Sequence, residues 1–277
     1  MVQSWPESVA LHDAIIDRLA SPEGRVRAED AISTAAALCG ESCIDATGEV
    51  DVKTLTILDP SKLFMAERQR TLPTIHPGQY VFSAAVNVFL SGDVAELDAM
   101  PPKCVFGVLR DQLRGAGYAR ADFPEVAKIF SRLARTIDPT NPVMWGRVPL
   151  SVPKENRPSI MPLQAAYELR GLVETLAAKM HTGKAEDRFA RLALCAYTLA
   201  KVLESVRDAI DPKVALTLAF ETTNGMAKMA PVPDGAFDDA EDHRYSIGKG
   251  IIAFAPSPAP PPRPTLLARL ARLFGAA

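Results

Sequence analysis

Apolar residues recur at three- and four-residue intervals along most of the chain, which is the spacing of one face of an α-helix. The widest stripe lies between Ala185 and Ile210 and predicts a helix that packs on two sides. Its apolar members are Phe189, Leu192, Ala193, Ala196, Leu199, Ala200 and Leu203. A second stripe, between Val26 and Ile44, consists mainly of small residues and indicates close packing against a neighbouring helix. Its members are Ile32, Ala35, Ala36, Cys39 and Cys43.

Further helices are predicted along the rest of the body, where the helix-favouring residues alanine and leucine are heavily used. We expect them at Glu7 to Ala20, Pro60 to Arg70, Gln79 to Leu90, Pro102 to Gly115, Phe123 to Ile137, Pro162 to His181 and Pro212 to Met229. Two of these helices begin at an Asp-Pro pair, Asp59-Pro60 and Asp211-Pro212. The Asp side chain accepts a hydrogen bond from an unpaired N–H of the first turn, and Pro has no N–H to leave unpaired.

Alternation of apolar and polar side chains, which is typical of a strand, is rare in this sequence. Val50 to Leu58 is the best strand candidate, because Val and Thr occupy every second position and Gly48 precedes them. Tyr245 to Phe254 is a second β-like stretch. The sequence therefore predicts at most a small strand element beside the helices.

These segments predict a mainly α fold: a helical bundle-type body, a proline-rich linker and a C-terminal amphipathic helix. The expected parts are a helical N-terminal part at 1–137, a proline-rich loop or linker at 138–160, a three-helix part at 161–230, an acidic and then proline-rich tether at 231–264, and a docking helix at 265–277. The prolines of 138–160 exclude a helix there. Two interpretations stay open for this stretch: a linker between domains, or a loop strapped across the surface.

Composition adds that the chain can bury a large core, since 48% of its 277 residues are hydrophobic and 23% are charged. Charge is unevenly placed. Residues 243–277 carry five basic residues and no acidic one, which leaves 26 Lys and Arg against 33 Asp and Glu in the rest of the chain. The acidic body argues against general nucleic-acid binding, which needs a basic face to displace counterions from phosphates.

The sequence also predicts a cytoplasmic protein. Residues 1–7 contain neither a positively charged leader nor an apolar run, and the longest mainly apolar segment, Tyr80 to Leu90, is too short to span a bilayer. The four cysteines are Cys39, Cys43, Cys104 and Cys195. They lie in apolar helical segments, so we interpret them as reduced thiols of the core rather than as disulfides or metal ligands.

No catalytic motif is complete. Asp238-Asp239-Ala240-Glu241-Asp242 matches D-D-x-x-D, a spacing of carboxylates that can bind magnesium. No second acidic motif accompanies it, and a solvated acidic loop is the favoured interpretation. Ser151-Val-Pro-Lys154 and Ser246-Ile-Gly-Lys249 read S-x-x-K, yet Pro or Gly breaks the helix that would align each pair. The sequence therefore predicts no catalytic residue, no metal site and no cofactor.

The C-terminal segment 265–277 is the clearest functional candidate. At 100° per residue its apolar side chains fall within an arc of about 120°, with two arginines beside it. The expected partner-binding residues are Leu266, Leu267, Arg269, Leu270, Arg272, Leu273 and Phe274. So short a helix is marginal alone in water and becomes ordered on a surface. That surface is the protein's own body or a second copy, a groove on a partner protein, or a membrane, which so few residues would bind only weakly and reversibly.

The leading hypothesis is thus an interaction or adaptor protein of a bacterial-type cytoplasm, whose C-terminal helix docks on a partner or on a second copy. The alternative is a helical enzyme with a site built from long-range contacts, metal-dependent through Asp238 to Asp242. The missing motifs favour a protein that is not an enzyme and leave that question open.

Overall fold

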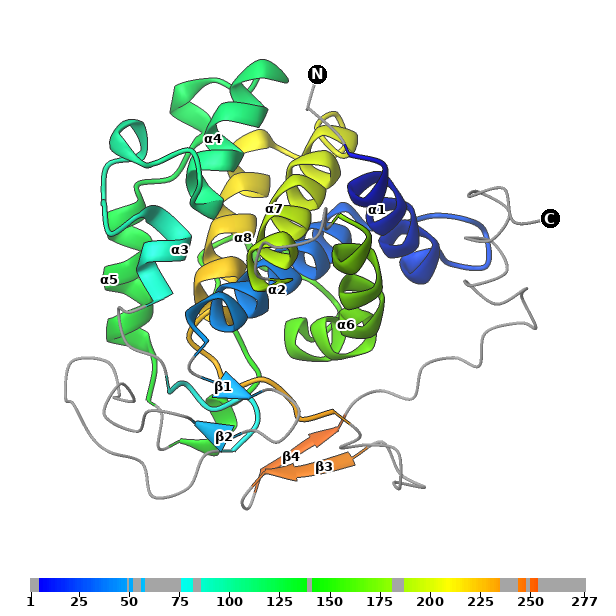
Figure 1. Cartoon of the computed structure of the whole chain (residues 1–277), viewed down its shortest axis with the longest axis vertical. Helices are drawn as coiled ribbons and strands as arrows, with labels where there is room; N and C mark the ends of the chain where they lie inside the picture. The colour runs from blue at the N-terminus through cyan, green and yellow to red at the C-terminus, as the bar shows by residue number, and fades with distance from the viewer. Residues whose placement is uncertain are drawn as a thin grey trace.

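The computed structural model describes residues 5–48, 50–51, 56–57, 76–81, 86–138, 141–180, 187–234, 244–247 and 250–253. Within these residues the fold is an all-α bundle, which confirms the predicted fold class (Figure 1). The helices are α1 (Pro6–Leu19), α2 (Ala28–Thr47), α3 (Asn87–Ser91), α4 (Val105–Gly115), α5 (Val126–Thr136), α6 (Pro162–Lys179), α7 (Asp187–Ser205) and α8 (Pro212–Met226). Short 3-10 turns are η4 (Leu97–Ala99), η5 (Arg120–Asp122), η6 (Pro142–Met144) and η7 (Lys154–Asn156).

Helix α2 lies at the centre of the bundle and contacts α1, α6, α7 and α8 (Figure 1). All five residues of its predicted stripe are fully buried, and so are most residues on its other faces. At Gly40 the backbones of α2 and α8 meet: a Cβ atom there would lie 2.5 Å from Cβ of Met226 and 2.6 Å from the carbonyl oxygen of Thr223. Small residues on α2 therefore permit the close approach that the sequence indicated.

Helices from before and after residues 138–160 share one hydrophobic core. Helix α2 packs on α6, α7 and α8, and α4 packs on α7. The described core residues run from Leu11 to Val232 as a single cluster. No helix in the described part of the chain is long and apolar enough to cross a membrane.

Helix ends follow local capping. Asp211 accepts hydrogen bonds from the N–H groups of Lys213 and Val214, so the predicted cap of α8 is confirmed. Helix α4 starts at Val105 rather than at Pro102, because Cys104 takes the cap position and its Sγ accepts from the N–H of Gly107 at 3.4 Å. The helix expected at Pro60 to Arg70 lies outside the described residues.

The helix predicted over Gln79 to Leu90 is wrong in its first residues. Residues 78–81 run beside the segment that follows α8: Val81 donates to the carbonyl of Lys228 at 2.9 Å, and Ala230 donates to the carbonyl of Gln79 at 2.8 Å. The helix begins only at Asn87. A turn at Gly78, whose φ is 77°, directs the chain into this pairing.

The strand predicted over Val50 to Leu58 is also corrected. Its two ends form separate strands, β1 (Val50–Asp51) and β2 (Thr56–Ile57), which pair with each other in antiparallel register. A lone strand would leave its backbone groups unpaired, and folding back satisfies them. The second β-like stretch contains β3 (Arg244–Ile247) and β4 (Gly250–Ala253), which form another antiparallel pair.

Candidate binding pocket

The predicted docking residues Leu266, Leu267, Arg269, Leu270, Arg272, Leu273 and Phe274 lie outside the described residues, and so does the acidic run 238–242. All four cysteines are buried and unpaired, as the sequence predicted. Burial raises the pKa of the Cys39 and Cys43 thiols, and Ser42 Oγ donates to Cys195 Sγ at 3.2 Å. Throughout the described ranges, no three His, Cys, Asp or Glu side chains come close enough to hold a metal ion.

A different site emerges from the proline-rich stretch. We call residues 141–161 the strap, because they run across the bundle surface and are fixed to it at several points. Its first half is tied to residues 78–80: the N–H of Gly146 donates to the carbonyl of Gly78 at 2.8 Å, and the Tyr80 hydroxyl donates to the carbonyl of Arg147 at 2.8 Å. These contacts tie the first half of the strap to the bundle.

Two serines attach the strap to buried carboxylates in the same way. Ser151 donates its N–H and its hydroxyl to the carboxylate of Glu221 on α8, each at 2.6 Å. Ser159 donates the same two groups to Asp30 on α2, also at 2.6 Å each. We call these the two serine clamps. Hydrogen bonds to an ionised carboxylate are stronger than neutral ones, so each clamp holds its end of the segment firmly.

Further contacts hold the segment between and beside the clamps. Arg27 donates to the carbonyls of Glu155 and Arg157 at 3.3 and 3.2 Å. On α8, Gly225 leaves room for the strap, since a Cβ atom there would lie 2.7 Å from Cγ1 of Val148. The strap is therefore a fixed part of the fold rather than an independent loop.

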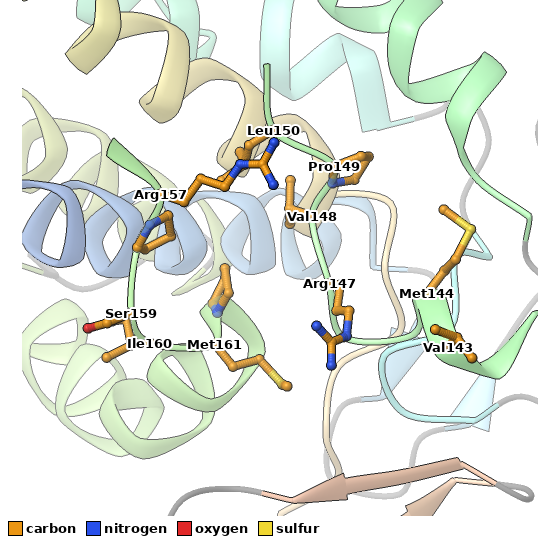
Figure 2. Close-up of a pocket in the computed structure, with 13 residues that line it drawn as sticks. Val143, Met144, Arg147, Val148, Pro149, Leu150, Arg157, Ser159, Ile160 and Met161 are labelled. Carbon is orange, nitrogen blue, oxygen red and sulfur yellow. The ribbon is translucent and has the colours of Figure 1, made fainter. Parts of the chain in front are cut away.

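A pocket of about 650 Å³ lies between the two limbs of the strap, residues 143–150 and 157–162 (Figure 2). This volume is typical of sites that bind ligands. Its lining is mainly apolar and comes from both limbs: Val143, Met144, Val148, Pro149, Leu150, Pro158, Ile160, Met161 and Pro162. Gly146, Arg147, Arg157 and Ser159 complete it.

Arg147 and Arg157 give this pocket its charge. Both line the pocket, one on each limb, and Figure 2 shows the Arg157 side chain extending toward Leu150 while the Arg147 side chain points away from it. Neither guanidinium forms an ion pair or a hydrogen bond with another described residue, and both residues are exposed. Arg170, by contrast, pairs with Glu41 and Asp234. The pocket thus combines an apolar lining with two positive groups that lack an anionic partner.

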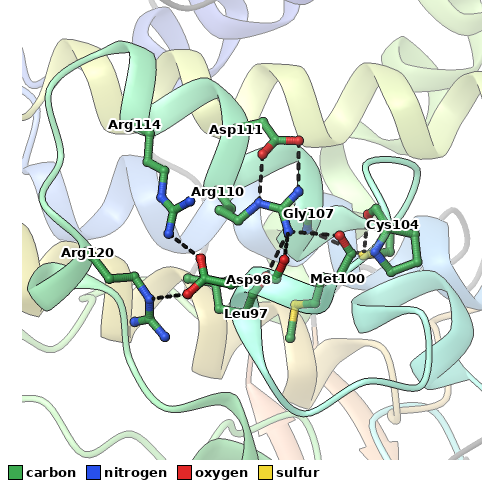
Figure 3. Close-up of polar contacts among 10 residues, drawn as sticks. Leu97, Asp98, Met100, Cys104, Gly107, Arg110, Asp111, Arg114 and Arg120 are labelled. Atoms are coloured by element: carbon green, nitrogen blue, oxygen red, sulfur yellow. Dashed lines mark hydrogen bonds and ion pairs between the residues drawn. The ribbon is translucent and has the colours of Figure 1, made fainter.

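A second polar cluster, between α4 and the segment that precedes it, has a structural role (Figure 3). Arg110 is buried and donates to the carbonyls of Leu97 and Met100 at 2.8 Å each, and also to the carboxylate of Asp111. Arg114 and Arg120 both bond Asp98 and hold the pKa of its carboxyl below the usual range. Because these groups satisfy one another, the cluster fixes the connection before α4 and offers no unpaired charge to a ligand.

Sequence reasoning missed the strap pocket. The available signal was a proline-rich, largely apolar stretch that contains the two arginines Arg147 and Arg157. Their spacing of ten residues matches no motif, and only the folded strap brings them to one cavity. Comparisons of this chain with protein-family models, with curated proteins and with solved structures gave no match.

Proposed function

We propose that this protein is an interaction protein that binds an anionic partner in the strap pocket. The observation that carries the proposal is the pair of guanidinium groups, Arg147 and Arg157, which face one pocket without a carboxylate partner among the described residues. A guanidinium presents several N–H donors in a plane, an arrangement that fits the oxygens of a carboxylate or phosphate. An anionic group whose oxygens accept hydrogen bonds from these guanidiniums would neutralise the positive charge of the pocket.

The lining indicates that the partner also has an apolar part. Val148, Leu150, Ile160 and Met161 are only partly buried in the described structure, and covering them removes apolar surface from water. The serine clamps fix both limbs before binding, so little conformational freedom is lost when the site is filled. A fixed apolar pocket with two cations favours an anionic, partly apolar partner over a fully hydrated ion.

A matched pair of fluorescent probes tests this proposal. Anilinonaphthalene sulfonate carries an aromatic body and one anionic group, whereas N-phenylnaphthylamine has the same aromatic body without the charge. We expect the folded protein to bind the sulfonate about tenfold more tightly than the amine, a difference of about 1.4 kcal/mol, and the preference to shrink as salt is added. Equal affinity for the two probes would show that the anionic group does not contribute to binding and would contradict the proposal.

The C-terminal segment supports a second mode of interaction. Its basic and amphipathic sequence at the end of an acidic chain favours docking on a partner or on a second copy. Deletion of residues 265–277 is expected to abolish partner recovery or to lower the oligomer mass, measured by light scattering. The Leu270→Glu, Phe274→Glu double variant should act in the same way, and an unchanged mass together with unchanged recovery would exclude this mode.

A further inference from the structure

The backbone of Val148 and Leu150 forms an unpaired edge beside the pocket. The N–H and C=O groups of these two residues make no hydrogen bond with any other residue that the structure describes. Their neighbours differ: the carbonyl of Arg147 accepts from Tyr80, and the N–H of Ser151 donates to Glu221. Pro149 has no N–H to offer.

Residues 147–151 belong to no strand of the structure, but their hydrogen bonds alternate as they do along a β-strand edge. In an extended segment, residues two apart direct their N–H and C=O groups to the same side, and the residue between them directs its groups to the other side. One side is bonded to the bundle through the carbonyl of Arg147 and the N–H of Ser151, while the N–H of Arg147 donates to Met144 within the strap. The other side, formed by Val148 and Leu150, is open to a further chain, and such an edge pairs readily with an added strand.

We propose that the partner bound in the strap pocket is an extended acidic segment of another polypeptide, which pairs with the backbone of Val148 and Leu150 and sets its carboxylates against Arg147 and Arg157. This inference rests on the proposed function and names its partner. The apolar residues of such a segment would contact the mixed apolar lining, since side chains alternate along an extended chain. A small anionic molecule would use the two arginines but would leave the backbone edge unpaired.

Backbone methylation of a peptide separates these two partners without changing the protein. The probes are acetylated and amidated heptapeptides in which Glu alternates with Val or Leu, measured by isothermal titration calorimetry against the full chain. In one derivative the N–H groups of residues 2, 4 and 6 of the peptide are methylated, and in the other those of residues 3 and 5. The matched charge control replaces every Glu of the peptide by Lys.

We expect the acidic peptide to bind, the Lys peptide to bind at least about tenfold more weakly, and only one of the two methylated derivatives to lose affinity, because a paired strand uses one edge. Equal tolerance of both methylation patterns would overturn strand pairing. Binding of the sulfonate probe without binding of any acidic peptide would also overturn this inference, yet it would leave the proposed function standing. Failure of both probe classes would contradict the proposed function itself.

Discussion

The hydroxyl and the N–H of Ser151 both donate to the carboxylate of Glu221, each at 2.6 Å. Seventy positions separate the two residues in the chain, so this contact fixes a surface segment to the core helix α8. Arg132 of α5 donates to the same carboxylate at 2.6 Å. One buried carboxylate thereby joins the strap, α5 and α8, and with the second clamp at Asp30 it determines the shape of the pocket.

Replacing Glu221 by Gln should destabilise the protein. An amide offers one accepting oxygen in place of two, so at least one of the three donors from Ser151 and Arg132 loses its partner. We expect the free energy of unfolding, measured with urea, to fall by about 1–3 kcal/mol. Glu125→Gln is the control, since that exposed side chain forms an ion pair with exposed Lys128 and should change stability by less than about 0.5 kcal/mol. Equal effects of the two changes would show that the contacts of Glu221 with Ser151 and Arg132 do not contribute to the free energy of unfolding.

Two glycines in helices should respond oppositely to alanine. A Cβ atom at Gly40 would collide with the backbone and side chains of α8, and we expect Gly40→Ala to cost about 1–3 kcal/mol. A Cβ atom at Gly171 of α6 would meet nothing within 4 Å, so Gly171→Ala should stabilise the protein by about 0.5–1 kcal/mol through helix propensity. Thermal unfolding of both variants tests this. A Gly40→Ala protein as stable as the parent would contradict the close contact of α2 and α8.

Asp45 should make stability depend on pH. Burial and the nearby Glu41 raise the pKa of the Asp45 carboxyl to about 6, although Arg191 opposes the shift. In the unfolded chain this group titrates near its ordinary pKa of 3.8, so between about pH 4 and 6 the folded state binds more protons. The contribution of Asp45 to stability therefore falls as pH rises through this window, by about 3 kcal/mol at most.

The measurement compares the parent with Asp45→Asn in urea at pH 4 and pH 7. The parent should be more stable relative to the variant at pH 4 than at pH 7, because Asn does not titrate. In the parent, Arg191 also lies 3.6 Å from the carboxylate of Glu174. A stability difference that is the same at both pH values would show that Asp45 titrates as an ordinary exposed carboxyl does.

The sequence predicted the helices well where their signal is local. The stripes of α2 and α7 depend only on residues three or four apart, and the cap at Asp211 depends on residues two and three positions further along. The sequence predicts a helix at Gln79 and Tyr80, since a short apolar run fits a helix as well as a strand. Their extended form depends on pairing with residues 229–230, about 150 positions away, which no local pattern records.

The pocket could not be predicted for a related reason. Its walls depend on contacts of Ser151 with Glu221 and of Ser159 with Asp30, which lie 70 and 129 positions apart. Prolines in the strap did exclude a helix there, so the irregular character of the stretch was correctly predicted. The path of the strap, and with it the placement of Arg147 and Arg157 in the lining of one pocket, follows from tertiary contacts alone.

The most direct test of the account is a fluorescence titration of anilinonaphthalene sulfonate into the Arg147→Gln, Arg157→Gln double variant. The control is the Arg114→Gln, Arg120→Gln double variant, which removes the same charge from the cluster at Asp98, where exposed ion pairs contribute little to stability. We predict that the pocket variant binds the probe at least about tenfold more weakly than the parent, while the control binds it as the parent does. Unchanged affinity of the pocket variant would contradict anion binding in the strap pocket.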